Sequence, residues 1–122
     1  MNLIIEAIFI GFYTSVLSLF LYSKINIYIN LFCLGFFKHL LGYYTGLHKY
    51  YCINNGKNTN LISNIIFKDS IYEGFCFIII GIIIIRLFNL NLFISTFFIG
   101  FTFHIIAEYI KLHSFFINHR CI

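Results

Sequence analysis

Four apolar runs of membrane-spanning length follow one another in a chain of only 122 residues. They cover residues 3–22, 27–47, 71–87 and 92–116. A bilayer core needs about 20 apolar residues per helix, so little chain is left for a soluble domain. Hydrophobic residues make up 61% of the chain and charged residues 10%, whereas soluble domains have about 45–50% and about 25%. We predict an all-α, polytopic membrane protein with four transmembrane helices.

A stretch near the middle of the chain recurs near its end. Residues 35–51 read GFFKHLLGYYTGLHKYY, and residues 100–116 read GFTFHIIAEYIKLHSFF. They align without a gap at a shift of 65 positions, with 6 identities in 17. A weaker similarity places Glu6 opposite Glu73 at a shift of 67. We therefore predict two tandem helical hairpins that enter the membrane from the same side, as in parallel repeats.

This interpretation divides the single membrane domain into a first repeat, residues 1–52, and a second repeat, residues 69–122. Residues 53–68 form the main loop between them. Leu61, Ile62, Ile65 and Ile66 recur there at helical spacing, which indicates a short helix on the membrane surface.

Basic residues are more frequent on one side of the predicted membrane than on the other. One side holds Lys49, Lys57, Lys68 and Arg120, and the other holds Lys24 and Arg86. The positive-inside rule then places both termini and the 48–68 loop in the cytosol. Reduced Cys52 and Cys121 would suit that compartment, whereas a lumenal loop would permit a disulfide between them.

The second helix of each repeat presents a stripe of small residues with a histidine set into it. The predicted helix-packing seam consists of Gly35, Gly42, Gly46, Gly100 and Ala107, because small residues let helices approach closely in lipid. The histidines of this seam are His39 and His104. One interpretation is that each hydrogen-bonds a neighbouring helix. The alternative is that they face each other across the repeat axis and share a metal, haem or proton.

Ionisable residues inside the predicted spans are costly, which makes them functional candidates. Lys38 lies near mid-span, and we predict an intramembrane ion pair between Lys38 and Glu108. Glu108 also follows His104 by four residues, the spacing at which a carboxylate can orient an imidazole. Glu6 and Glu73 lie about one turn inside the membrane, where they would either reach the interface or serve a proton-coupled transporter.

Sulfur and imidazole groups gather at one predicted membrane surface. They are His48, Cys52, His113, His119 and Cys121. Such groups can bind zinc, although no standard ligand spacing is present. Haem between His39 and His104 is the other cofactor alternative. His48 and His113 would be poor ligands for a second haem in the same bundle, because nine residues of helix turn them to the opposite face. No cofactor is predicted as the leading interpretation.

The stretch LLGYYTGLHKYYC at 40–52 and the stretch HIIAEYIKLH at 104–113 resemble small, uncharacterised multi-pass membrane proteins of giant DNA viruses. The resemblance implies a host or virion membrane, and it carries over no functional residue. In size and helix number the chain is also similar to small multidrug transporters, which place a lone glutamate in their first helix, as Glu6 does here.

The leading prediction for function is a small, non-enzymatic integral membrane protein that acts as a scaffold or assembly component. The sequence contains no nucleophile elbow, phosphate loop or HExxH motif, which argues against an enzyme. Its expected partners are the lipid bilayer, a second copy or other membrane proteins, and not nucleic acid. The alternatives are a redox or metal protein that uses His39, His104 and Glu108, and a transporter that uses Glu6 and Glu73.

Overall fold

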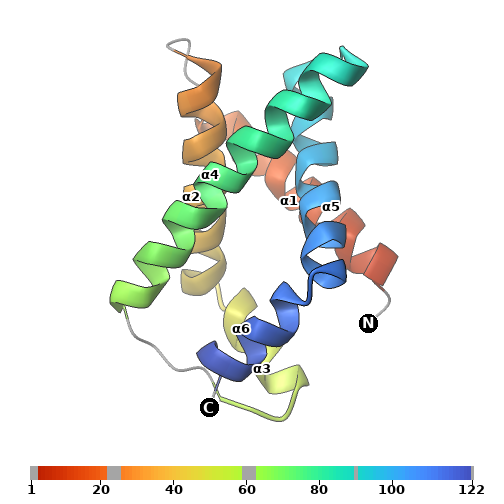
Figure 1. The fold of residues 1–122 in the computed structure, drawn as a ribbon. Helices are drawn as coiled ribbons and strands as arrows, with labels where there is room; N and C mark the ends of the chain where they lie inside the picture. The colour runs from red at the N-terminus through yellow and green to blue at the C-terminus, as the bar shows by residue number, and fades with distance from the viewer. Residues whose placement is uncertain (1–2, 22–25, 59–62, 90, 122) are drawn as a thin grey trace.

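Six α-helices make up most of the computed structural model, which describes residues 3–21, 26–58, 63–89 and 91–121. They are α1 (Leu3–Leu21), α2 (Ile27–Tyr44), α3 (Leu47–Asn54), α4 (Ser63–Phe88), α5 (Leu92–Tyr109) and α6 (Leu112–Arg120). The four long helices form a bundle, and the short helices α3 and α6 lie together at one end of it (Figure 1). We call α3 and α6 the cap helices, α1–α3 the N-terminal half and α4–α6 the C-terminal half.

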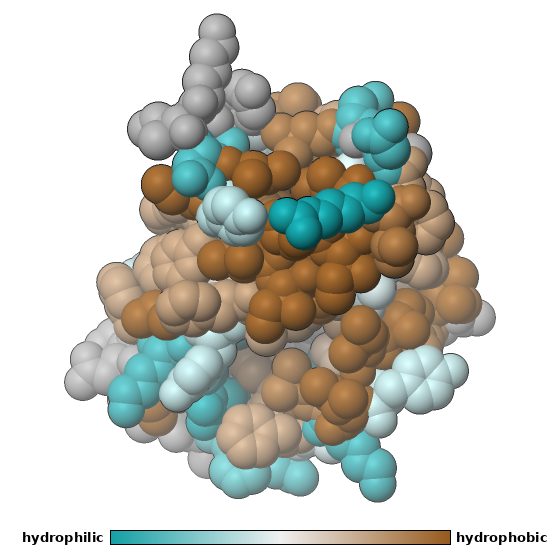
Figure 2. Space-filling model, turned by 45° about the horizontal axis from the view of Figure 1, so that its top comes forward, coloured by the Kyte–Doolittle hydropathy of each residue, from teal (hydrophilic) through white to brown (hydrophobic). Residues whose placement is uncertain are grey.

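Within the described ranges, three helices are long and apolar enough to cross a membrane: α1, residues 65–88 of α4, and α5. Only 28% to 33% of the residues in these segments are buried inside the protein. The face seen in Figure 2 is mostly apolar across its middle, and hydrophilic side chains gather mainly toward its upper and lower parts. Lipid can solvate such a surface, whereas exposing it to water is unfavourable in free energy. The all-α membrane class follows from these helices.

The second long helix of each half begins at an asparagine. Asn26 Oδ1 accepts a hydrogen bond from the Tyr28 amide at 2.7 Å, and Asn91 Oδ1 accepts one from the Ile94 amide at 2.8 Å. Asparagine is favoured at this position because its side chain satisfies an amide that has no partner within the helix. Asn26 and Asn91 are 65 positions apart, which is the shift that aligns the two similar stretches.

Each long helix packs mainly against a long helix of the other half: α1 packs along α5, and α2 packs along α4. Glycines bring these pairs close together. A Cβ atom on Gly35 would lie 2.7 Å from the Glu73 carbonyl oxygen, and one on Gly11 would lie 2.8 Å from the Phe97 ring. A larger residue would not fit at these positions. The glycines therefore let the helix backbones approach closely, as small residues do between membrane helices.

The glycine contacts also give an alignment of α1 with α4. Gly11 and Gly74 each face a phenylalanine ring of the helix packed against them, and those two rings are 65 positions apart in the chain. Gly11 therefore corresponds to Gly74, at a shift of 63. By this register Glu6 corresponds to Asp69. This alignment differs by four residues, or about one helical turn, from the predicted shift of 67, which places Glu6 opposite Glu73.

Two breaks shorten the predicted second and fourth spans. Gly46 has φ of 87° and Lys111 has φ of 60°, both in the left-handed region, which a right-handed helix cannot continue. The cap helices begin directly after these residues, at Leu47 and Leu112. The predicted continuous helices over 27–47 and 92–116 are therefore wrong, since each consists of a long helix followed by a separate short one.

The helix predicted on the membrane surface within residues 53–68 is not a separate element in the described part of the chain. Ile65 and Ile66 belong to α4, which continues without a break to Phe88. Leu61 and Ile62 lie outside the described residues.

The interior differs between the two helix pairs. The apolar core is centred on α2 and α4 and contains Leu17, Leu31, Leu34, Phe77, Ile84 and Ile99. Between α1 and α5 the contact is partly polar, because Ser18 Oγ and Thr96 Oγ1 lie 3.3 Å apart and Ser15 Oγ donates to the Phe93 carbonyl at 3.2 Å. Hydroxyl groups of this kind hold helices together where apolar burial adds little, as in lipid.

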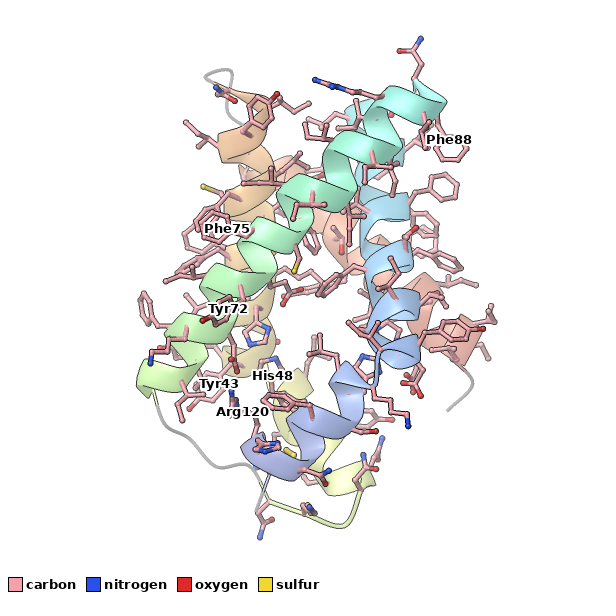
Figure 3. All side chains as sticks on the ribbon, viewed as in Figure 1. Tyr43, His48, Tyr72, Phe75, Phe88 and Arg120 are labelled. Atoms are coloured by element: carbon pink, nitrogen blue, oxygen red, sulfur yellow. A yellow bond between two sulfur atoms is a disulfide. The ribbon has the colours of Figure 1, made fainter. Side chains whose placement is uncertain are left out.

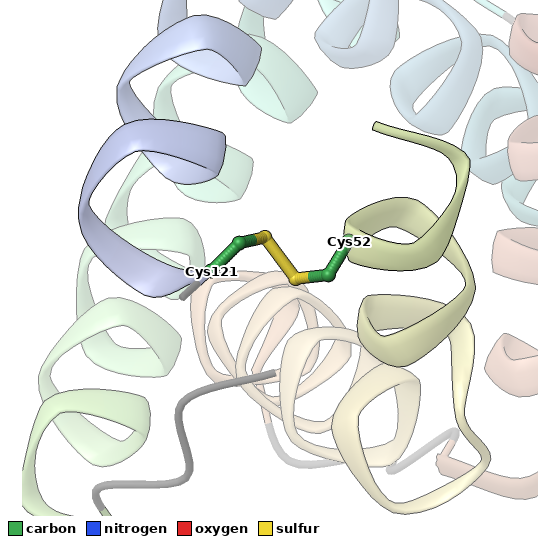
Figure 4. Close-up of a disulfide and its surroundings, with 2 residues drawn as sticks. All are labelled: Cys52 and Cys121. Carbon is green, nitrogen blue, oxygen red and sulfur yellow. A yellow bond between two sulfur atoms is a disulfide. The ribbon is translucent and has the colours of Figure 1, made fainter. Parts of the chain in front are cut away.

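A disulfide joins Cys52 of α3 to Cys121, which follows α6 (Figure 4). The two cysteines are 69 positions apart, and both are buried. The bond therefore connects the N-terminal and C-terminal halves at the end of the bundle where the cap helices lie. The sequence alone leaves the oxidation state of this pair open.

Candidate functional site

Glu73 is the centre of the first cluster of buried ionisable groups. Its side chain, on α4, is 7% exposed, and α2 engages both carboxylate oxygens. Lys38 Nζ donates to Oε1 at 2.5 Å, and His39 Nδ1 lies 2.6 Å from Oε2. Because each group is met by a partner of complementary charge or hydrogen-bonding type, the cluster satisfies the main condition for burying charge.

The second cluster joins the other helix pair. His104 of α5 is buried, and its Nε2 lies 3.2 Å from Glu6 Oε2 of α1. The two clusters are therefore similar in kind, since each pairs a histidine of one half with a glutamate of the other half. They use different ring nitrogens, Nδ1 in His39 and Nε2 in His104. This difference fits the helix register, because Glu6 lies one turn from the position that corresponds to Glu73.

A second histidine lies against each of these histidines. The rings of His39 and His48 have centroids 4.6 Å apart, and so do the rings of His104 and His113. The prediction that His48 and His113 turn to the opposite face is wrong, because it assumes one continuous helix. The left-handed residue before each cap helix, Gly46 in the first case, turns the chain back onto the bundle.

Glu108 belongs with His113 rather than with Lys38. His113 Nδ1 lies 2.6 Å from Glu108 Oε2, and the Glu108 side chain is 50% exposed. The predicted Lys38–Glu108 ion pair is therefore wrong, since Lys38 is paired with Glu73. The reason is the packing order: α2 lies along α4, so the lysine meets the carboxylate of that helix. Glu108 likewise orients the imidazole of a cap helix, and not His104 as predicted.

Lys38 also marks the centre of the bundle. Its Nζ lies over the rings of Phe77 and Phe103, 5.6 Å from each centroid. Positions 38 and 103 align at the shift of 65, so aligned positions of the two similar stretches meet here. The predicted meeting of His39 with His104 is not the arrangement seen, because each contacts a separate glutamate.

Burial controls the protonation of the cap histidine His48. Its pKa is lowered from 6.5 to about 3, mainly because burial disfavours the charged imidazolium. Electrostatic interactions with His39 and Lys38 lower this pKa further, while the carboxylates of Glu73 and Asp69 act in the opposite direction. His48 is therefore neutral near pH 7 and can accept a hydrogen bond.

An ion pair at the same end of the bundle adds a second connection to the cap. Arg120 Nε and Nη2 donate to the two carboxylate oxygens of Asp69 at 2.8 and 3.1 Å. These hydrogen bonds raise the pKa of the Arg120 guanidinium. His48 and Arg120 both lie at the cap end (Figure 3). The pair fastens the end of α6 to α4, beside the disulfide that fastens it to α3.

The predicted zinc ligands serve separate purposes. They are His48, Cys52, His113, His119 and Cys121, and the two cysteines are bonded to each other. His119 Nδ1 lies 2.9 Å from the Phe115 carbonyl oxygen, and its ring stacks on the Phe115 ring. Within the described ranges, no group of three or more His, Cys, Asp and Glu side chains is arranged to hold a metal ion.

The predicted packing seam is used inside the molecule. Gly35 faces the backbone of α4, Gly100 faces the Thr14 side chain and the Ile10 carbonyl of α1, and Ala107 is buried. A Cβ on Gly42 would lie 3.4 Å from an imidazole of the cap, so this glycine makes room for the cap helix. A Cβ on Gly46 would meet no atom within 4 Å, and this glycine supplies the turn instead. Its assignment to the seam is therefore wrong.

Four pairings escape the sequence-based prediction: Glu73 with Lys38 and His39, Glu6 with His104, Glu108 with His113, and Asp69 with Arg120. The sequence does hold a signal for the register of α1 against α4. Residues 6–12 read EAIFIGF and residues 69–75 read DSIYEGF, which align at the shift of 63. Chemically, the clusters place carboxylates and imidazoles in contact, and such groups neutralise charge or exchange protons.

Comparisons with protein-family models, with curated proteins and with solved structures give no match to this chain.

Proposed function

We propose that the protein is a four-span integral membrane protein with a structural, non-enzymatic role, built from two duplicated helical units. The proposal makes α2 the fourth span. This helix has 18 residues and packs along α4, and its main obstacle to insertion is the charge of Lys38. An isolated lysine at a helix centre costs about 2.5–3.5 kcal/mol on insertion scales. The contact with Glu73 reduces that obstacle.

The observation that carries the structural role is the complete engagement of Glu73 by its own chain. Lys38 occupies one carboxylate oxygen and His39 the other. A site for a substrate or an ion needs a group that is open to it, whereas a satisfied buried network specifies how helices fit together. The network spans both halves, so it favours one arrangement of α2 against α4.

The outer surface supports partners within the bilayer. Tyr72, Phe75 and Phe88 of α4 are 69%, 55% and 64% exposed (Figure 3). Gly35, Gly42 and Gly100 pack against other parts of the molecule. Lipid, a second copy or another membrane protein would therefore meet exposed aromatic and aliphatic faces. This revises the prediction that glycine seams mediate assembly.

A second candidate, proton-coupled transport, is favoured by one series of contacts. It runs from the half-exposed Glu108 through His113 and His104 to Glu6, with separations of 2.6, 4.6 and 3.2 Å. The middle value is between ring centroids. Carboxylates and imidazoles in sequence can pass protons.

Proton flux separates the two candidates. Proteoliposomes containing a pH-sensitive dye would be given an inward proton gradient, with a potassium diffusion potential to balance charge. The structural role predicts proton entry equal to that of protein-free liposomes, and unchanged in His104→Gln. Entry that requires the wild-type protein and is abolished by His104→Gln, but not by the matched surface variant His119→Gln, would contradict it. A haem band or a stoichiometric metal in purified, untagged protein would also contradict it and would favour the redox alternative.

A further inference from the structure

The disulfide selects two of the four cysteines in the chain. It joins Cys52 and Cys121 at the cap, whereas Cys33 of α2 and Cys76 of α4 are free thiols, each partly buried. The bonded pair thus lies at one end of the bundle, and the free pair lies within helices of the bundle. The oxidised cysteines thus lie at the cap, and the reduced cysteines lie on the long helices.

The path of the chain agrees with one shared compartment for the bonded pair. Between Cys52 and Cys121 the chain passes through α4 and α5, both of membrane-spanning length. Two crossings return the chain to the side from which it started. The same side therefore holds α3 and α6, whether or not α2 spans the membrane.

We propose that the cap faces an oxidising compartment and that the Cys52–Cys121 bond holds α3 and α6 over the buried clusters. Disulfides persist in oxidising compartments such as the periplasm, the endoplasmic reticulum lumen or the cell exterior, and cytosolic thiols are kept reduced. This orientation is the reverse of the one that basic residues predict. That bias is small, at four residues against two, and one of the four, Arg120, is paired with Asp69.

The bond has a structural task at this position. The His48 ring of α3 lies against His39 of the first cluster and 5.1 Å from the Phe116 ring of α6. Holding α3 and α6 together keeps His48 between them, over the end of the bundle where Glu73 is buried. Separation of the two helices would open that end to water.

The oxidation needs an electron acceptor. The two thiols lose two protons and two electrons as the sulfur–sulfur bond forms, and a disulfide-bearing oxidoreductase of the same compartment accepts the electrons and becomes a dithiol. The membrane would shield Cys33 and Cys76 from such an enzyme.

Thiol labelling in sealed membrane vesicles of known orientation tests the proposal. A full-length Cys33→Ser, Cys76→Ser variant leaves only the cap pair. Membranes would be quenched with N-ethylmaleimide, treated with a membrane-impermeant phosphine, and labelled with maleimide-polyethylene glycol. A Phe88→Cys change in a background with all four native cysteines replaced by serine reports the opposite end of the bundle, since Phe88 ends α4 and is exposed.

We expect two polyethylene glycol additions after reduction and none before it, and only when the phosphine reaches the non-cytosolic face. Phe88→Cys should be labelled by an impermeant maleimide only from the cytosolic face. Cap thiols that N-ethylmaleimide blocks before reduction would overturn the proposal. A disulfide that is reduced only from the cytosolic face would overturn the orientation. As a folding control, the Cys33→Ser, Cys76→Ser variant should be obtained in the oxidised form and in the same yield as the wild type.

Discussion

Replacing Glu73 by leucine removes the acceptor of both Lys38 and His39 and leaves an ammonium group among apolar side chains. Loss of one partner of a buried ion pair costs about 3–5 kcal/mol, because the remaining charge is uncompensated. The Glu73 side chain is 7% exposed and that of Lys38 is 11% exposed, so water screens neither. We expect Lys38→Met to cost less, about 1–3 kcal/mol, because the carboxylate keeps its contact with His39.

The double variant Lys38→Met, Glu73→Leu distinguishes a pair from two independent residues. Removing both charges together should cost about 1–3 kcal/mol less than the sum of the single changes. The free energy of unfolding would be measured in detergent by titration with sodium dodecyl sulfate and far-ultraviolet circular dichroism. Glu108→Gln is the matched control, because its carboxylate is half-exposed and should contribute less than about 1 kcal/mol. Additive single costs, or a Glu108→Gln effect as large as that of Glu73→Leu, would refute the pairing.

Three further outcomes are expected from the same unfolding assay. Lys111→Gly should stabilise the protein by about 1 kcal/mol and Gly46→Ala should destabilise it by a similar amount, because both positions are left-handed and only glycine adopts that conformation freely; equal signs would contradict this. Stability should fall as the pH drops from about 6.5 towards 3, by up to about 1.4 kcal/mol per pH unit. In this range His48 is protonated in the unfolded state but not in the folded state, where its pKa is about 3. A pH profile of the His48→Gln variant as steep as that of the wild type would contradict this. Cys52→Ser should cost about 2–4 kcal/mol, since the bond closes a loop across 69 positions, and a reductant should then have no further effect on that variant.

The helical class and the close helix contacts at glycines can be predicted because their signals are local in the sequence. Apolar runs of the required length predict membrane helices, and the glycines at 35 and 100 indicate close helix contacts, which both make. The helix break at Lys111 cannot be read in the same way. Lysine carries no turn signal, and only its alignment with Gly46 indicates a left-handed residue.

The partners of the buried charges depend on which helices pack together, and the sequence does not state this. Counting turns along two helices that are assumed to be neighbours assigns Lys38 to Glu108. In the structure α2 lies along α4, which presents Glu73. The alignment of Glu6 with Glu73 matches identical residue types and neglects the neighbouring glycines, whose positions are restricted more strictly by backbone contact.

The residue opposite Lys38 explains why the proposed duplicated halves had to diverge. Two identical units would place a lysine at both 38 and 103, and these positions meet at the centre of the bundle. Two ammonium groups that close together in a medium of low dielectric repel strongly. Phe103 replaces that repulsion with a ring face, which attracts a cation. A lysine at 38 that meets a phenylalanine at 103 therefore favours two halves that differ at this contact over two identical ones.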